Sequence, residues 1–331
     1  MNRYHTTLAY LKNNNISYDL AIEAHDLLRA ARGGEISGVS VEEHDYPQAQ
    51  VKLVKILNEQ GASQMNKPIG SYLTISSDVL FINNRKYHQK LAEIIASELT
   101  ELHFLRSDAL VLVAGLGNRR ATPDALGPRI AEQIIATRHL HGRVPAEILA
   151  GVRPVAALAP SVLGITGIET AEMLKAVTDL IKPELLVVCD ALAAGDVSRI
   201  GTTIQIADSG INPGSGLGNE RTAINQSTMG VPVLAIGVPT VVNAAVIAHN
   251  ILENFLDELE AERPFAQIRD QLSPEIFERA AAASLHPYNN RLNVTPKEID
   301  DLINNTASVI AKALSLYLHP NMNADFAEIF V

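Results

Sequence analysis

Two aspartates, Asp124 and Asp190, are the residues of this sequence whose surroundings most favour chemistry. Asp124 follows the apolar run 109–117 and the turn "GNRRATP", and Asp190 ends the apolar run "LLVVCD". In open α/β sheets, ligands bind outside the carboxyl ends of the strands. If the two strands are neighbours, both carboxylates face one crevice.

Such a pair has a recognisable chemistry. Two close carboxylates cannot both ionise at low cost, so one serves as an acid and the other as a base. An acid and a base together can activate water against a peptide carbonyl. The same oxygens could instead hold a divalent cation, which would make the protein a metal-dependent hydrolase.

The turn before Asp124 also fits simpler interpretations. It resembles a nucleotide-binding loop, but Arg120 stands where the dinucleotide pattern needs its third glycine, and no Walker lysine follows. Thr122 as N-cap and Pro123 as first helical residue would place Asp124 in the first turn of a helix. There its carboxylate would gain about 0.3–1 kcal/mol from the helix dipole. Only a partner such as Asp190 gives Asp124 a further role.

These residues need a framework, and the hydrophobic pattern predicts an α/β fold. Buried strands are expected within 109–117, 184–192 and 231–239, with an alternating strand at 202–208. Helices are expected from Pro123, over 168–181 and over 240–259, so that helices cover a mixed or parallel sheet. Outside these segments, the pattern predicts a helix over 20–34, β structure over 50–80, a helix over 88–105 and a last helix capped by Thr295 and Glu298.

We expect four regions along the chain. They are a polar N-terminal segment that is poorly ordered or removable (1–19), an N-terminal flanking region (20–106), an α/β catalytic core (107–259) and a C-terminal region with a terminal helix (260–331).

A glycine-rich loop, "DSGINPGSGLGNER", follows the strand at 202–208. Its backbone N–H groups could hold a phosphate or a substrate backbone. The candidate substrate-loop residues are Gly214, Ser215, Gly216, Gly218 and Asn219. If the aspartates are only helix caps, this loop would make the protein a ligand-binding α/β module rather than an enzyme.

The composition narrows the class of protein. A net charge of −10 argues against a general nucleic-acid surface, which needs a basic patch. The single cysteine, Cys189, excludes an internal disulfide, suits a reducing compartment and is interpreted as a buried strand residue. No apolar run is long enough to span a membrane, and the histidines show no metal-binding spacing.

Several stretches together resemble the germination protease family, the endopeptidases of bacterial spores. They include "DLAIEAH", "VKILNEQGASQMNKPIGSYLTI", "GLGNRRATPDALGP", "RPVAALAPSVLGITGIET", "DALAA", "TTIQIADSGINPGSGLGNER", "GVPVLAIGVPTVVNAA" and "VTPKEIDDLI". They follow in order through nearly the whole chain. The sequence departs from the family pattern at Gly195, where an arginine is common, and at Asn243, where an aspartate is common.

The resemblance implies a protease that degrades the small acid-soluble proteins coating spore DNA as germination begins. It implies a cytoplasmic homotetramer of the forespore and spore core, made as a zymogen that removes its own N-terminal segment. It also implies a three-layer α/β/α core with a mostly parallel twisted sheet, similar to hydrogenase-maturation proteases, plus a smaller flanking β-containing layer.

The family's proposed catalytic aspartates fall on Asp124 and Asp190. No cofactor is expected, although a divalent metal is not excluded. The family cuts between an acidic residue and an apolar one followed by alanine, which predicts self-cleavage between Asp19 and Leu20.

Overall fold

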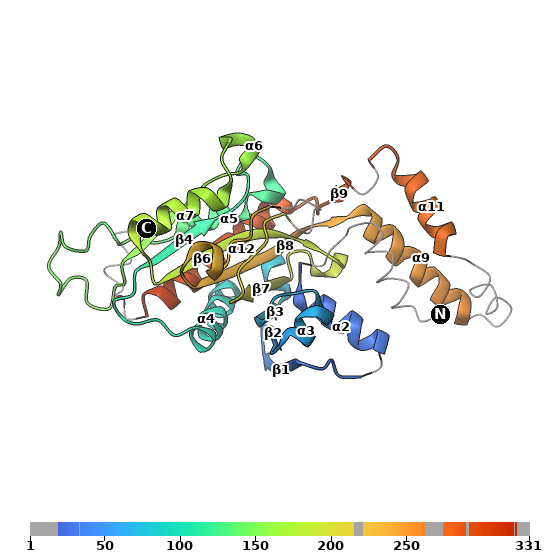
Figure 1. Ribbon diagram of the computed structural model, residues 1–331, viewed down its shortest axis with the longest axis horizontal. Coiled ribbons are helices and arrows are strands. Elements are labelled where there is room, and N and C mark those ends of the chain that lie inside the picture. Colours follow the sequence, from blue (N-terminus) through green and yellow to red (C-terminus); the bar gives the residue numbers. More distant parts are fainter. Residues whose placement is uncertain are drawn as a thin grey trace.

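The computed structural model describes residues 19–32, 34–214, 221–261, 274–288, 291–320 and 322. Within these residues one mixed sheet of nine strands has the order β1-β2-β3-β7-β8-β6-β4-β5, with β9 paired to β8 (Figure 1). The strands are β1 (Val39–Tyr46), β2 (Ala49–Ile56), β3 (Gly70–Ser76), β4 (Val111–Gly115), β5 (Val155–Leu158), β6 (Leu185–Ala194), β7 (Thr203–Ala207), β8 (Val233–Asn243) and β9 (Asn293–Val294).

Helices connect and cover these strands. The α-helices are α2 (Ala21–Arg32), α3 (Glu59–Met65), α4 (Arg85–Leu102), α5 (Leu126–Gln133), α6 (Leu163–Thr166), α7 (Thr170–Ile181), α8 (Gln226–Met229), α9 (Ala244–Ala261), α11 (Pro274–Leu285) and α12 (Ile299–Leu318). Short 3₁₀ turns are η1 (Asp78–Phe81), η2 (Thr122–Asp124) and η3 (Val197–Arg199).

Strands β8, β6, β4 and β5 form the parallel part of the sheet, which helices cover on both faces. Alternate residues of β4 and β6 enter different clusters. Val113 and Val187 pack in the cluster that includes α4, α5 and α12, whereas Leu112 and Val188 pack in the cluster with α7 and α8. Figure 1 shows α7 and α4 on opposite sides of these strands. Burial on both faces explains the continuous apolar runs that predict these strands.

The rest of the sheet is antiparallel, so the core strands are mostly parallel, as predicted, but the sheet as a whole is mixed. β1 pairs with β2, β2 with β3 and β3 with β7, each antiparallel, and β7 pairs antiparallel with β8. The predicted flanking layer is therefore an extension of the same sheet. Its outer strand β1 (VSVEEHDY) is polar and largely exposed, so it gives no continuous apolar run in the sequence. Helix α3 lies between β2 and β3 in the chain.

The predicted start of the last helix also differs from the structure. α12 begins at Ile299 after Glu298, without a side-chain cap. Thr295 does not cap it; its hydroxyl donates to the carbonyl oxygen of Thr240 at 2.9 Å. The Thr-Pro-x-Glu pattern therefore does not form a capping box, and its threonine instead forms a hydrogen bond to β8.

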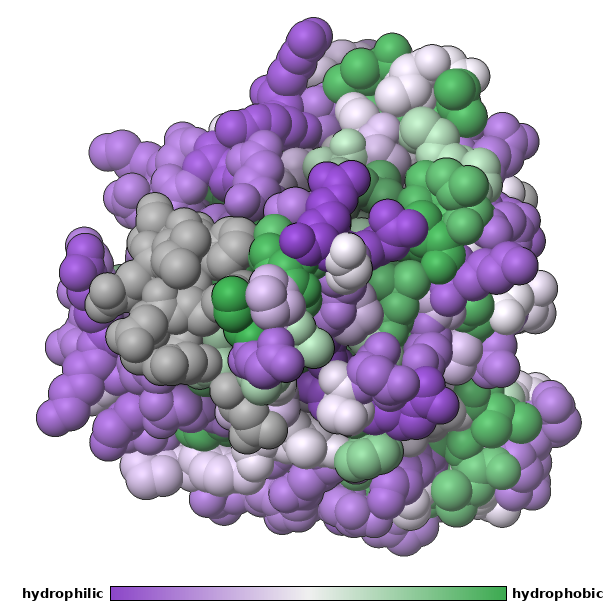
Figure 2. All heavy atoms as spheres, turned by 90° about the vertical axis from the view of Figure 1, so that its left-hand side faces the viewer, coloured by the Kyte–Doolittle hydropathy of each residue, from purple (hydrophilic) through white to green (hydrophobic). Residues whose placement is uncertain are grey.

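α9 and α11 pack on each other and extend away from the end of the sheet (Figure 1). α9 exposes Ile251 and Phe255, which retain 61% and 56% of their accessible surface. Among the helices of the described residues, none is long and apolar enough to cross a membrane. Figure 2 shows the opposite end of the molecule, where hydrophilic side chains predominate and apolar ones gather in smaller groups.

Candidate active site

β4 and β6 bring the two predicted aspartates to one cavity. The strands pair in parallel with Gly115, the last residue of β4, opposite Cys189, and β6 continues beside β8 to Ala194. Asp190 is the next residue of β6, and the turn after β4 leads to Asp124. Both side chains line a cavity of about 260 Å³. The structure thus places the carboxylate pair together, as the strand ends predict.

The glycines of the turn allow Asp124 to reach this position. Gly117 has φ of +113°, and a Cβ there would collide with the backbone carbonyl of Asp124. Such a φ is rare for residues with side chains. The backbone N–H of Asn118 then donates to Asp124 Oδ2 at 2.8 Å. The turn therefore holds the carboxylate from its own backbone.

Asp124 does not cap a helix in the predicted way. α5 begins two residues later, at Leu126, with Ala125 at its N-cap. Asp124 closes the 3₁₀ turn η2, which Ala121 precedes without a side-chain cap, so Thr122 is not the cap either. The carboxylate binds the amide of Asn118 in the preceding loop. Asp124 thus lies in the first turn of η2 rather than in the first turn of α5.

The two carboxyl groups have different surroundings. Asp190 is only 6% exposed, and burial raises its pKa well above the usual range, assisted by the negative charge of Asp124. A hydrogen bond from Ala191 N–H acts in the opposite direction. Burial also raises the pKa of Asp124, but the Asn118 amide and the positive charge of Arg221 oppose this rise. Burial and the charge of Asp124 thus favour the protonated form of Asp190, while the Asn118 amide and Arg221 favour the ionised form of Asp124.

Arg221 and Thr240 are cavity residues that sequence reasoning did not single out as functional. Arg221 pairs with Glu169 at 3.4 Å. Glu169 stands at the N-cap of α7 but makes no side-chain cap bond. Thr240 Oγ1 donates to the carbonyl oxygen of Pro123 at 2.7 Å and so secures the turn that carries Asp124.

The predicted substrate loop reaches this cavity at Gly214, which is one of its lining residues. Ser215, Gly216, Gly218 and Asn219 lie outside the described residues. Their role in holding a substrate backbone stays a prediction.

The predicted cleavage site also lies at the cavity. Asp19 lines it, and the Asp19 carboxylate accepts a hydrogen bond from Ala193 N–H at 2.9 Å. The Asp19 carbonyl oxygen accepts from Lys67 Nζ and from Gln205 Nε2, each at 3.0 Å. Leu20 is fully buried. Sequence reasoning missed Lys67 and Gln205, because no spacing connects residues so far apart in the chain.

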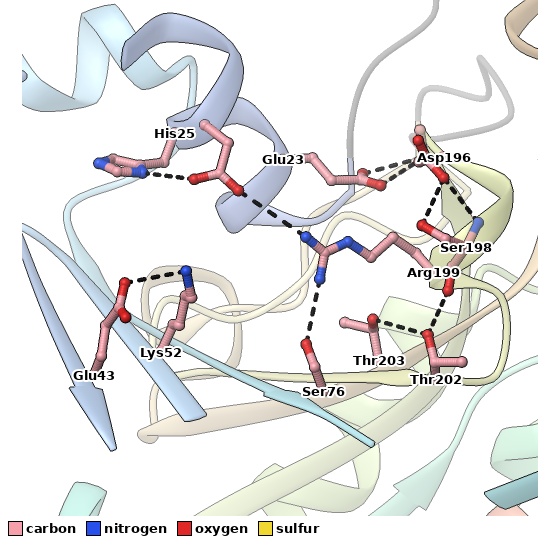
Figure 3. Close-up of polar contacts among 12 residues, drawn as sticks. Glu23, His25, Glu43, Lys52, Ser76, Asp196, Ser198, Arg199, Thr202 and Thr203 are labelled. Carbon is pink, nitrogen blue, oxygen red and sulfur yellow. Dashed lines mark hydrogen bonds and ion pairs between the residues drawn. The ribbon is translucent and has the colours of Figure 1, made fainter. Parts of the chain in front are cut away.

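A second buried carboxyl group, Glu23, lies on α2 close to the cleavage site. Both of its oxygens accept from Gly195 N–H at 3.1 Å, and burial raises its pKa to about 8. Figure 3 shows Glu23 directed at the chain just before Asp196, with Arg199 beside it. Gly195, one of the departures from the family pattern, thus holds α2 through its backbone.

The second departure, Asn243, lies at the start of α9. Its Oδ1 accepts from Ala245 N–H at 2.8 Å. Asn243 therefore bonds to the first turn of α9, and its side chain is almost fully buried.

Cys189 has no exposed surface, and burial raises its pKa. This confirms its interpretation as a buried strand residue. In the described part of the chain, no group of three or more His, Cys, Asp or Glu side chains is arranged to hold a metal ion.

Comparison with known proteins identifies the relatives of this chain. A family model described as germination protease matches residues 21–274. The germination protease of Clostridium tetani is 41% identical over 315 residues, which cover 94% of this chain and 98% of that protein. That of Caldanaerobacter subterraneus is 44% identical over 311 residues, 93% of this chain and 95% of its own length. The germination protease of Bacillus subtilis is 36% identical, with coverage of 94% and 95%.

The match to the family model spans the segment from α2 to α9, which carries Asp124 and Asp190. The matches confirm the enzymatic interpretation over the binding module, because the family hydrolyses peptide bonds. The chain therefore belongs to the germination protease family, whose members are peptidases of spores.

Proposed function

We propose that Asp124 and Asp190 act together as the base and the acid of peptide hydrolysis. The Asp124 carboxylate takes a proton from a water molecule, whose oxygen attacks the peptide carbonyl. Protonated Asp190 then gives its proton to the leaving nitrogen. The observation that carries this proposal is the shared cavity, in which burial and the charge of Asp124 raise the pKa of Asp190.

Substitution of each aspartate tests the pair. Asp124→Asn and Asp190→Asn remove the base and the acid, so each should lower kcat by about 10²–10⁴. Asp179→Asn is the matched control, since Asp179 is an exposed residue of α7 that pairs with Lys175. Cleavage of a protein substrate at the wild-type rate by both variants would sink the assignment.

A chelator distinguishes the metal-dependent alternative, which would use the same two carboxylates. Under the proposed mechanism the chelated enzyme keeps its activity. Loss of activity that one divalent cation restores would instead favour metal-assisted hydrolysis.

We further propose that the protein is made as a zymogen and removes residues 1–19 by cutting between Asp19 and Leu20. Asp19 lines the cavity of the carboxylate pair, and α2 begins immediately after Leu20. N-terminal sequencing of the matured protein should show Leu20 first. A different first residue would contradict the proposed site.

The family also suggests the biological setting. We propose that the substrates are small acid-soluble spore proteins, that the enzyme acts in the cytoplasm of the forespore and spore core, and that it is a homotetramer. The proposed likeness to hydrogenase-maturation proteases is supported by the two acidic residues of the parallel strands, since Asp190 lies on β6 and Asp124 lies in the turn after the neighbouring strand β4. Sedimentation of the purified protein tests the tetramer, and digestion of purified spore proteins tests the substrate class.

A further inference from the structure

The carbonyl oxygen of Asp19 is held by two side chains from distant parts of the chain. Lys67, in the turn after α3, and Gln205, on β7, each donate to it at 3.0 Å. This oxygen belongs to the peptide bond between Asp19 and Leu20. The contact therefore falls on the bond at which self-cleavage is proposed.

Gln205 binds the backbone on both sides of Leu20. Its Oε1 accepts from Ala21 N–H at 2.6 Å while its Nε2 donates to the Asp19 carbonyl. A carbonyl needs a donor and an N–H needs an acceptor, so the two bonds agree on the orientation of the amide. Together with the bond from Ala193 N–H to the Asp19 carboxylate, they position the chain before and after the bond.

This arrangement is partly shielded from water. Leu20 has no exposed surface. Burial lowers the pKa of Lys67, while the negative charges of Asp19 and Glu23 favour its charged form. Donors fixed in a site of low dielectric stabilise a developing negative charge more strongly than they do in water.

Asp19 also connects the Lys67–Gln205 pair to the aspartates. It lines the cavity of about 260 Å³ that contains Asp124 and Asp190, and a second cavity of about 90 Å³ that contains Lys67 and Gln205. A water molecule takes about 30 Å³ of liquid volume, so either cavity has room for one.

We propose that Lys67 and Gln205 form the oxyanion site for self-cleavage between Asp19 and Leu20. The inference rests on the proposed self-cleavage and adds catalytic residues to it. The water oxygen bonds to the carbonyl carbon of Asp19 and its proton passes to Asp124, while the carbonyl electron pair moves onto the oxygen that Lys67 and Gln205 hold. That pair then re-forms the double bond, the carbon–nitrogen bond breaks, and the Leu20 nitrogen takes the proton of Asp190. The products are a carboxylic acid at Asp19 and an amine at Leu20.

Substitutions in the full chain test this role. Lys67→Met and Gln205→Leu should each slow self-cleavage about 10²–10³-fold, the range for loss of one oxyanion donor. The cut should stay after Asp19, and Lys67→Arg should recover part of the rate because it keeps a charged donor. Lys55→Met and Gln50→Leu, on strand β2 of the same sheet, are matched controls that should keep the wild-type rate, since Lys55 pairs with exposed Glu42.

The pH profile separates catalysis from a structural role. Deprotonation of Lys67 removes its positive charge, so the wild-type rate should fall on the alkaline side, and Lys67→Met should lack that fall. Thermal unfolding checks that each variant is folded; if Lys67→Met is not, Gln205→Leu carries the same test. Wild-type rates in Lys67→Met and Gln205→Leu, with the cut still after Asp19, would overturn this inference alone. A wild-type cut elsewhere would overturn the self-cleavage proposal as well.

Discussion

Burial decides the protonation of single residues in this protein, and Glu23 shows the effect outside the carboxylate pair. Its side chain is buried, and the only donor that the structure gives its carboxyl oxygens within the described residues is Gly195 N–H. Nearby Arg199 partly offsets the burial, which still dominates and raises the pKa of Glu23 to about 8. At neutral pH the folded protein thus holds a proton that the unfolded chain releases.

The first prediction concerns stability against pH. Because the pKa of Glu23 is raised from 4.5 to about 8, the folded state binds the extra proton between these values, and stability falls as pH rises through that window. Glu23→Gln resembles the protonated form at every pH. Its stability relative to the unsubstituted chain should therefore increase as the pH rises from 5 to 8. The gain should be on the order of a few kcal/mol, since one pKa unit corresponds to about 1.4 kcal/mol.

Urea unfolding at a series of pH values measures this difference, in chains kept uncleaved by Asp124→Asn. Glu147→Gln is the control, because Glu147 is exposed. If the difference in unfolding free energy between the chain with Glu23 and the Glu23→Gln variant did not change with pH, the raised pKa of Glu23 would be contradicted.

At the scale of elements, the close approach of β4, β6 and α5 positions Asp124. Gly127 in the first turn of α5 lies against the backbone oxygens of Leu116 and Cys189, and Gly115 of β4 lies against the carbonyl of Gly127. Neither glycine leaves space for a Cβ. The start of the helix can therefore rest directly on the two strand ends, which brings the η2 turn over the cavity.

The second prediction is that Gly127→Ala separates these elements. Helix propensity alone would favour alanine by about 1 kcal/mol. The added Cβ would collide with two backbone carbonyls, and overpacking of this kind costs about 1–3 kcal/mol. The variant should unfold at lower temperature and lose activity, since α5 and Asp124 must move.

Gly164→Ala is the matched control. Gly164 is also helical, but a Cβ there meets nothing within 4 Å. Thermal unfolding and a peptidase assay on both variants decide the question. Equal stability and equal activity would show that the close contact does not position the site.

At the scale of the whole molecule, the start of the described chain is bound to several separate elements. Asp19 and Glu23 contact β6 and the residue after it, Gln205 of β7 binds on both sides of Leu20, and Lys67 follows α3. These contacts come from the same chain. Such positioning converts a bimolecular reaction into a unimolecular one.

The third prediction follows from these contacts. Self-cleavage should be first order, with a rate constant that does not change on dilution. Wild-type enzyme should leave an added Asp124→Asn chain intact, because that chain keeps its own cleavage site bound in its own cavity. Gel analysis over a wide dilution series measures both effects. A rate that rises with protein concentration, or efficient cutting of the added chain, would contradict intramolecular processing.

Local patterns in the sequence predict the parallel part of the fold. The runs that contain β4, β6 and β8 are apolar at almost every position because both faces of these strands are buried. Asp124 follows the end of β4, and Asp190 lies on the neighbouring parallel strand β6 just past that end, which is why the pair is predictable without a structure. The caps were predicted less well, because Thr122 and Thr295 have the residue types of caps, but neither has its side chain bonded to the helix that follows it.

The sequence by itself determined the α/β class, the strand-end aspartates and the acidic–apolar–alanine motif at Asp19. Periodicity, turn residues and short motifs are local, so the chain reveals them directly. Only the tertiary structure decided that β3 pairs with β7, that Lys67 and Gln205 meet the Asp19 carbonyl, and that Glu23 binds Gly195. These contacts join segments that are far apart and share no local pattern, and they form only when the whole sheet brings those segments together.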